Sequence, residues 1–488
     1  MILDKDLGAS MITHIIQKEL RENLLNLRFI IACIITVVLI VVTILTLANT
    51  YTADIRDYND RQKVQEDFIS HYGHLNRVGW MARPLRPPDR YSFLVTGIDR
   101  EANQENFLSN PMPVLFSQTD LVTVVTIIMS LMAILFSYNS ISGEREMGML
   151  KQMLSSNISR STIIFGKFIG GVISLLVPFI LGLLSGILVI SINPDIILQR
   201  TDLVIFLMLL IVSILYISAF YALGLYFSAR SRSSNVSVLK SLFAWVVLVL
   251  MLPNISPFLA ARFYHLPSKT KIDMETWTIT SEERDTIVNR KTNELLRGEY
   301  RDIADKIKNS SFSGNDTSLQ RKFKNDPVLK ERYSQFHKNW MSMVTQVNLD
   351  QQAKVSTLQK DFEERSKFQE KIATVVACIS PLANYDLAAT DLADAGIGAD
   401  DHWQEEVNNY HNAMDPILMS IYNKAIKNNP QLSVNDFIDL HDLPRFQHQS
   451  VGSYEKITMV LPYIGMLIFY NLLFIIGAWI SFLKYDVR

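Results

Sequence analysis

The sequence predicts an α-helical polytopic membrane protein: six transmembrane helices, with a large, mostly helical extracytoplasmic domain between the fifth and sixth spans. Its 488 residues are 49% hydrophobic and 19% charged, a balance between that of a soluble enzyme and that of a protein made only of spans. Apolar runs of the length that a helix needs to cross roughly 30 Å of hydrocarbon recur along the chain. The chain is therefore predicted to combine membrane spans with folded segments outside the membrane.

The six predicted spans are the charge-free apolar runs of the sequence. They cover residues 29–47, 121–138, 168–192, 203–227, 242–261 and 457–482. The first run is too long for the apolar core of a signal peptide, follows a charged segment and precedes no small-residue cleavage site. We therefore expect it to remain as an anchor.

Lysine and arginine in the short connections predict the orientation. They gather in residues 1–28, 139–167, 228–241 and 483–488, which the positive-inside tendency places on the cytoplasmic side together with both termini. The remaining connections, residues 48–120, the Asn193-Pro194 turn and residues 262–455, are then extracytoplasmic.

Several kinds of site are disfavoured. A formal net charge of -1 without a basic arm gives no reason to expect nucleic acid, and Cys33 and Cys378 cannot form a disulfide framework. No phosphate-binding loop or nucleophile elbow is present, so we expect no catalytic residue in this chain. Scattered loop histidines and aspartates are interpreted as solvated rather than metal-binding; they are His71, His74, His441, Asp442 and His448, with Asp386, Asp391 and Asp394 as exposed helix carboxylates.

Helix patterns dominate the long extracytoplasmic segment. Thr280 and Glu283 fit a capping box at a helix start. Two apolar faces at helical spacing follow, one made of Val344, Val347, Val355, Leu358 and Phe362, the other of Tyr410, Met414, Ile417, Leu418, Ile421 and Ala425. In the smaller segment, the run RPLRPPDRYSF predicts an extended path and YSFLVTGI a strand.

A charged loop, SGEREMGMLKQMLSSNISRSTIIFGK, lies between the second and third spans. Met147, Leu150, Met153 and Leu154 share one face of a predicted amphipathic helix while Lys151 faces outward, and residues 157–159 end it. Such a helix either lies among the lipid headgroups or acts as a lever docked on a cytoplasmic motor.

This loop resembles that of ABC-2 type transporter permeases. The family pattern has an acidic-basic-acidic triplet, a Gly-Thr-Leu-like helix, a Ser-Arg pair and a Gly-Lys at the next span. The matching residues here are Glu144, Arg145, Glu146, Gly148, Leu150, Ser159, Arg160, Gly166 and Lys167, with Met149 and Asn157 as departures. The start of the chain is similar to the elbow helix of such permeases, with Leu20, Leu24 and Leu27 on one face. The insert before the last span resembles the enlarged subgroup with a DUF3526 region.

The resemblance implies a mechanism and partners. Such permeases work in pairs, with an identical or related second copy, on separate cytoplasmic ATPase subunits that bind ATP and Mg²⁺; this chain needs no cofactor of its own. The residues implied in coupling to the ATPase are Glu144, Arg145, Glu146, Gly148, Leu150, Lys151, Arg160 and Lys167. The family also implies a bacterial inner membrane.

Prolines interrupt the fifth predicted span. Pro253 and Pro257 indicate either a kink or a broken, re-entrant end that contributes to an exit gate. Three functions stay open: an exporter of an amphiphilic or apolar substrate, a mechanotransmission or scaffold subunit that acts on an extracytoplasmic partner or on metalloprotein maturation, and a membrane-anchored sensor.

Overall fold

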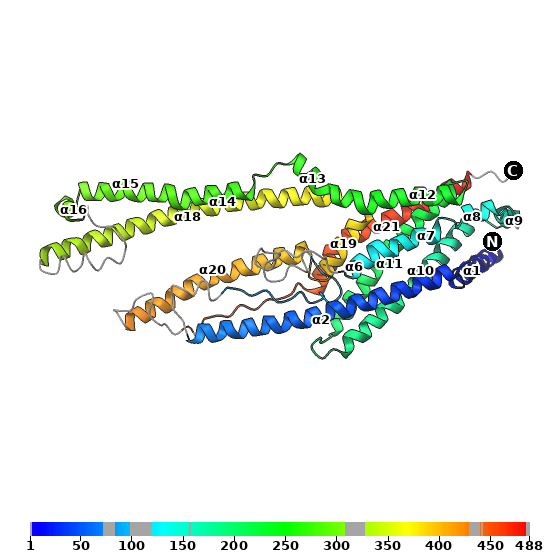
Figure 1. Ribbon diagram of the computed structural model, residues 1–488, viewed down its shortest axis with the longest axis horizontal. Helices are drawn as coiled ribbons and strands as arrows, with labels where there is room; N and C mark the ends of the chain where they lie inside the picture. Colours follow the sequence, from blue (N-terminus) through cyan, green and yellow to red (C-terminus); the bar gives the residue numbers. More distant parts are fainter. Residues whose placement is uncertain are drawn as a thin grey trace. The chain divides into compact units, whose positions relative to one another are not determined.

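The computed structural model describes residues 2–71, 83–97, 119–155, 158–307, 327–428, 440 and 443–484. Within these ranges every regular element is a helix and there is no strand (Figure 1). Six helical segments are long and apolar enough to cross a membrane: Phe29–Ile69, Leu121–Glu146, Arg160–Ile192, Arg200–Arg230, Ser234–Phe263 and Ser453–Leu483. The predicted fold class, an α-helical polytopic membrane protein, is confirmed.

The chain forms two compact units. Unit 1 comprises Met1–Asn254 and Ala377–Arg488, and unit 2 comprises Ile255–Val376. The insert predicted as one domain, residues 262–455, is therefore divided, because its last part joins the helix bundle of unit 1.

Unit 2 is built on two antiparallel helical rods. One rod runs without interruption through α14 (Lys269–Trp277), the π-helical η3 (Thr278–Glu283) and α15 (Arg284–Arg297), followed by α16 (Arg301–Ile307). The other is α18 (Pro327–Ala377). Across the pair, Trp340 donates to the Thr292 hydroxyl at 3.0 Å and Lys354 pairs with Glu283 at 3.2 Å. Thr280 lies inside a continuous rod, so the capping box predicted there is wrong; the N-cap of this rod is Ser268.

The two apolar faces predicted for the insert both pack. On α18, Val344 and Val347 are buried, and the buried Gln351 continues their row. The second face belongs to α20 (Ile397–Asn428) in unit 1; Tyr410, Met414, Leu418, Ile421 and Ala425 pack with Ile69, Leu440 and Leu443. Ile69 belongs to α2 (Leu27–His71), a 45-residue helix that continues well beyond the predicted end of the first span at residue 47.

Glycines let α10 (Arg160–Ile192) approach its neighbours closely. A side chain at Gly166 would collide with Ile15 of α1 (Ile2–Leu24), and one at Gly170 with Glu19. On the side of α2, a side chain at Gly182 would collide with Ile40 and one at Gly186 with Ile44. Each pair of glycines is four residues apart, so both lie on one helix face. Small residues at this spacing are typical of close helix packing in membranes.

Two spans contain a π-helical stretch in which a carbonyl group accepts a hydrogen bond from another element. In the second span, α6 (Leu121–Thr123), η1 (Val124–Met129) and α7 (Ser130–Ser137) follow one another, and Tyr216 donates to the Thr126 carbonyl at 3.0 Å. In the fifth span, η2 (Val246–Met251) separates α12 (Ser234–Trp245) from α13 (Leu252–Phe263), and Ser380 donates to the Leu248 carbonyl.

The predicted break at Pro253 and Pro257 is absent. Both prolines lie in α13, directly after η2, and the helix continues through them. A proline lacks an N–H and crowds the carbonyl four residues before it. For Pro253 this is the carbonyl of Val249, which lies in the wider π turn of η2 and is accommodated there. The prolines therefore alter the helix locally without ending it.

A different segment turns back inside the bundle. The turn before α19 (Pro381–Leu392) lies beside the middle of α21 (Ser453–Leu483), since Tyr470 donates to the Cys378 carbonyl at 3.1 Å. The other end of α19 lies beside the start of α21, where Lys456 pairs with Asp394. About 20 Å of α21 separates these two positions at about 1.5 Å per residue, so α19 runs antiparallel to α21.

The segment predicted as a strand is a turn. Leu94 and Val95 both donate backbone hydrogen bonds to the Tyr91 carbonyl, at 2.9 and 3.1 Å, and residues 83–89 have no regular structure. Tyr91, Phe93, Leu94 and Val95 are all buried. A short apolar run bounded by polar residues fits a strand and a buried turn equally well, so the sequence pattern does not distinguish the two.

Candidate functional site

The charged loop folds into two short helices rather than one. α8 (Ser142–Glu146) and α9 (Met149–Ser155) are separated by Gly148, whose φ of 76° lies in the left-handed region that glycine tolerates. Met147, predicted on the packed face, is instead 67% exposed, whereas Leu150 is fully buried. Asn157 lies outside the described residues.

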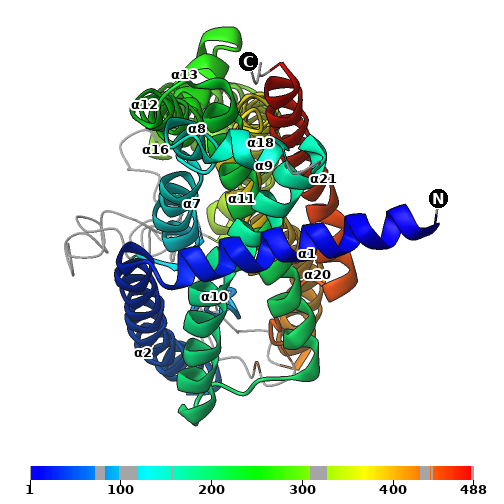
Figure 2. The same cartoon turned by 90° about the vertical axis from the view of Figure 1, so that its right-hand side faces the viewer.

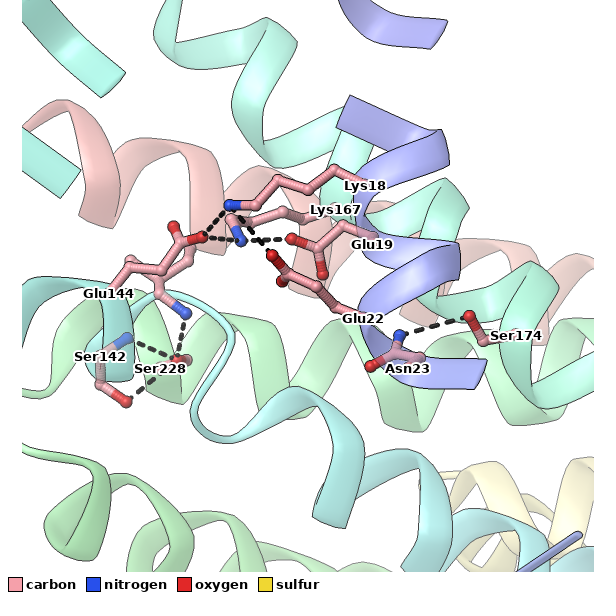
Figure 3. Close-up of polar contacts among 10 residues, drawn as sticks. Lys18, Glu19, Glu22, Asn23, Ser142, Glu144, Lys167, Ser174 and Ser228 are labelled. Atoms are coloured by element: carbon pink, nitrogen blue, oxygen red, sulfur yellow. Dashed lines mark hydrogen bonds and ion pairs between the residues drawn. The ribbon is translucent and has the colours of Figure 1, made fainter. Parts of the chain in front are cut away.

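A buried charge cluster lies beneath this loop (Figure 3). Lys167, in the second turn of α10, places its Nζ 2.6 Å from Glu19 Oε1 of α1 and 2.9 Å from Glu144 Oε1 of α8. Lys18 approaches the same Glu144 oxygen at 3.1 Å. The side chains of Lys167, Glu19 and Glu144 are only 2%, 8% and 7% exposed.

This cluster joins helices that are distant in sequence. A charge buried in a membrane helix is costly unless it is paired, so Lys167 requires both carboxylates and each carboxylate requires the lysine. Nearby, Asn23 of α1 donates to Ser174 of α10 at 3.2 Å. We name Lys18, Glu19, Glu144 and Lys167 the clamp, because they hold α1, α8 and α10 together.

Arg145 is directed to the end of another span. It donates to the Ser231 and Ala229 carbonyl oxygens at 2.8 and 3.1 Å, at the end of α11 (Arg200–Arg230). The last carbonyl groups of a helix lack partners within the helix and carry partial negative charge, so a guanidinium stabilises them.

The remaining charged residues of the loop make similar contacts. Glu146 accepts hydrogen bonds from the backbone N–H and the hydroxyl of Ser234, at 3.1 and 2.7 Å, in the first turn of α12. Arg160 donates to the Phe482 and Leu483 carbonyl oxygens at 3.1 and 2.6 Å, at the end of α21. The triplet Glu144-Arg145-Glu146 therefore makes contacts within this chain.

Apolar packing supports these polar contacts. Leu150 is buried in a cluster with Ile15, Ile141, Ile163, Ile164, Leu225, Ala229, Ala478 and Phe482. Before α8, the Ser228 hydroxyl accepts the backbone N–H groups of Ile141 and Ser142, each at 3.0 Å. Several described residues of the loop are exposed, Glu146, Ser155 and Ser159 among them. The exposed residues between α8 and the middle of α9 are Met147, Gly148, Met149, Lys151 and Gln152, which we define as the tip.

The elbow helix packs through a face other than the predicted one. α1 lies across the end of the bundle that carries α8 and α9 (Figure 2), which we call the α1 end. It contacts α10 through Ile15 and Glu19, whereas Leu24 and Leu27 are 39% and 69% exposed and Leu20 is half-buried. Leu27 already belongs to α2.

The histidines and aspartates that the sequence analysis interpreted as solvated are a separate group of residues. Among the described residues, no group of three histidine, cysteine or acidic side chains could hold a metal ion. His448 pairs with Glu406 at 2.6 Å, while His74, His441 and Asp442 lie outside the described residues. The three aspartates are not exposed carboxylates as predicted: Asp386 and Asp391 of α19 are partly buried, and Asp394, just after α19, is 8% exposed and paired with Lys456.

Sequence reasoning missed Glu19 and Ser228. Lys167 was assigned to the end of a loop, but α10 begins at Arg160 and places it inside the helix, against α1. A lysine so close to an apolar run is the one available signal, because a buried cation requires an acidic partner. Glu19 stands on an amphipathic helix more than one hundred residues away, and no local pattern identifies it as that partner.

Comparison with known protein families agrees with this architecture. The family described as "ABC-2 family transporter protein" matches residues 13–486, which is nearly the whole chain. A comparison with curated proteins finds no match. The match runs through α1, the charged loop, all six candidate spans and unit 2. The chain therefore belongs to the ABC-2 family of transporter proteins.

Proposed function

We propose that this chain is the membrane-spanning subunit of an exporter driven by ATP hydrolysis on a separate cytoplasmic subunit. Its family membership and its six apolar helices support a transport component. The sequence has no phosphate-binding loop of its own, so ATP and Mg²⁺ would be bound by the partner. The α1 end faces the cytoplasm in this proposal, as the lysine and arginine distribution favours.

The contacts of the triplet carry the proposal. Glu144 is joined to α1 and α10, Arg145 to the end of α11, and Glu146 to the start of α12. Buried ion pairs resist separation, because a partner left alone would be an unpaired buried charge. A displacement of the loop would therefore be transmitted to four helices at once, which a force-transmitting element requires.

We assign the exposed tip of the loop to a partner. Met147 and Met149 are 67% and 38% exposed, and Lys151 is exposed beside them. Methionine side chains are flexible and polarisable, so they adapt to a shallow apolar groove. We assign the ATPase contact to these residues and the transmission of force to the clamp and Arg145.

The composition of the spans supports the proposed substrate class. Their apolar runs are rich in Leu, Ile, Val and Phe and carry no charged residue, which suits an amphiphilic or apolar substrate better than a bare ion. The complex would contain a second permease, identical or related, in a bacterial inner membrane, as is typical of this class of transporter.

Co-purification from native membranes tests the proposal. We expect an ATP-hydrolysing subunit to remain bound to the wild-type chain and to be lost from the Met147→Glu/Met149→Glu variant. Met274→Glu is the matched control, because Met274 is 70% exposed in unit 2. A wild-type chain that retains no nucleotide-binding subunit would contradict the exporter.

A mechanotransmission subunit is the second candidate, and the shape of unit 2 favours it. α18 has 51 residues, a rod of about 75 Å at about 1.5 Å per residue. Ion pairs such as Lys354–Glu283 brace it against its partner rod. The two candidates differ in whether a substrate crosses, so transport of amphiphilic compounds into inverted vesicles that contain the purified complex distinguishes them.

A further inference from the structure

A short segment crosses the end of the bundle opposite to the α1 end. We name it the strap, Arg90–Gly97. Its apolar side chains point into the bundle, where Tyr91, Phe93, Leu94 and Val95 are at most 3% exposed. The strap contacts residues of α2, α6, α11, α21 and the corner between α19 and α20.

One side of the strap is bound tightly to α11. Asp202, which is 2% exposed, accepts both Nε and Nη2 of Arg90 at 3.0 Å and the Tyr91 hydroxyl at 2.8 Å. It also accepts the Gln199 backbone N–H at 2.7 Å, which caps the helix. Removing the strap would leave a buried carboxylate without three of its four donors, so the strap and α11 should move as one body.

The strap is tied to the second span by backbone and side-chain hydrogen bonds. Leu121 donates its N–H to the Leu94 carbonyl at 3.0 Å. Thr96 donates its N–H to Asp120, at 3.2 Å, and Asp120 in turn caps α6 through Thr123. These contacts add the start of the second span to the body formed by the strap and α11.

The opposite side of the strap has no such hydrogen bonds among the described residues. Lys456 of α21 lies with its Nζ 5.2 Å from the centre of the Tyr91 ring, and it pairs with Asp394 rather than with the strap. Gly97 lies against Ala395 so closely that a Cβ at position 97 would be 2.2 Å from the Ala395 carbonyl oxygen. A cation over a ring and a close backbone contact separate more easily than the three hydrogen bonds that the strap donates to Asp202.

The backbone at Asp394 indicates that its carboxylate is needed there. Asp394 follows the end of α19 with a φ of 61°, the left-handed conformation in which helices usually place glycine. It is the only residue other than glycine with a positive φ in the part of the chain that the structure describes. A glycine would relieve the backbone but could not pair with Lys456, which is 3% exposed.

We propose that the strap closes this end of the bundle and that the Lys456–Asp394 pair is its latch. The latch fixes Lys456 over the Tyr91 ring of the strap. When the latch parts, Lys456 is released from this position and the bundle opens between the α21 side and the strap, which stays with α11 and α6. Under the orientation proposed above, this end is the outer one, so the strap would seal the extracytoplasmic side. The latch itself is independent of whether an ATPase drives it.

Cysteine labelling tests the strap in the purified chain in lipid nanodiscs. Cys33 and Cys378 are first replaced by serine, and Val95, which is fully buried, is changed to cysteine. We expect a water-soluble maleimide to label Val95→Cys slowly. Adding Asp394→Asn should raise the labelling rate about tenfold, the change in an opening equilibrium for about 1.4 kcal/mol.

A second variant opens the same contact without changing a charge. Gly97→Ala forces Ala395 away and should also raise the labelling of Val95→Cys. Glu455→Gln, next to the latch on an exposed side chain, is the matched control and should leave the rate unchanged. Ile217→Cys, fully buried in α11, should stay unreactive in every variant.

Two results would overturn the proposal. One is a rate at Val95→Cys that neither Asp394→Asn nor Gly97→Ala raises. The other is equal labelling of Ile217→Cys in those variants, which would mean that the whole bundle loosens. Because the assay needs no partner subunit, a failed co-purification would contradict the exporter and leave this result standing.

Discussion

The two ends of the helix bundle both bury charged side chains, but they hold them differently. At the α1 end, Lys167 is shared by Glu19 and Glu144, and all three stand on helices that meet at one point. At the other end, Asp202 binds the strap with three hydrogen bonds, while the Lys456–Asp394 pair joins α21 to the end of α19 and meets the strap where Lys456 lies over the Tyr91 ring. The first arrangement resists separation in every direction, whereas the second has one preferred place to part.

Removing the buried cation of the clamp, Lys167, should have the largest effect. Lys167→Met leaves Glu19 and Glu144 facing each other in a buried site, and breaking a buried pair in this way costs about 3–5 kcal/mol. We expect a strong loss of folded protein and of thermal stability in detergent, measured by fluorescence-detected size exclusion.

The clamp as a whole can be neutralised as a control. The triple variant Glu19→Gln/Glu144→Gln/Lys167→Met has no unpaired buried charge, because Lys18 is partly exposed and keeps its pair with Glu22 at 3.7 Å. It should recover much of the stability, since a neutral replacement of a buried pair is often tolerated. A single variant as stable as the wild type, or a triple variant worse than the single one, would contradict the clamp.

The carboxylate at the strap should come next. Asp202→Ala removes the acceptor of Arg90, of Tyr91 and of the Gln199 N–H, and unsatisfied buried donors cost about 1–3 kcal/mol. At the same end, Asp195 pairs with Arg56 at 2.6 Å, but both side chains are substantially exposed. Asp195→Ala should therefore change thermal stability little. Equal losses of thermal stability for Asp202→Ala and Asp195→Ala would contradict the stabilising role of the hydrogen bonds to Asp202.

Packing between α1 and α10 should matter less than charge. A Cβ at Gly170 would lie 2.9 Å from Glu19 Cβ and 3.3 Å from the Ile16 carbonyl, so Gly170→Ala pushes α1 away from the clamp. Overpacking of this kind costs about 1–3 kcal/mol. Gly465→Ala in α21 is the control, because no atom lies within 4 Å of its Cβ position. Equal melting temperatures for Gly170→Ala and Gly465→Ala would show that the close contact between α1 and α10 does not contribute to stability.

The smallest effect concerns pH. Burial raises the pKa of Asp89 to about 6, against the opposing attraction of Arg86. A carboxyl group with a raised pKa stabilises the fold in its protonated form, so this contribution is present at low pH and is lost as the pH rises through about 6. Asp89→Asn mimics the protonated form. The contribution is fully present only below the ordinary carboxyl pKa of about 3.9, so Asp89→Asn should raise the melting temperature at about pH 7.5, less at about pH 5 and not at about pH 3.5. A gain of equal size at about pH 7.5 and about pH 3.5 would contradict the assignment.

How much the sequence predicted depended on whether the signal was local. The six apolar runs and the charged loop are local patterns, so the spans and the triplet were found. The pairing of Lys167 with Glu19 depends on two helices packing through Gly166 and Gly170. The glycine spacing indicates a close-packing face but does not identify the partner helix. The capping box at Thr280 failed for the opposite reason: a local signal was overridden when α18 paired with a continuous rod.

The central claim is that the triplet works inside the chain while the tip contacts the ATPase. One crossed measurement tests it: melting temperature and bound ATPase for Arg145→Ala and for Met147→Glu/Met149→Glu. We predict that Arg145→Ala lowers the melting temperature and keeps the ATPase, because Arg145 binds the end of α11. The methionine variant should keep the melting temperature and lose the ATPase. The reverse pattern, with the ATPase lost from Arg145→Ala and kept by the methionine variant, would contradict the account.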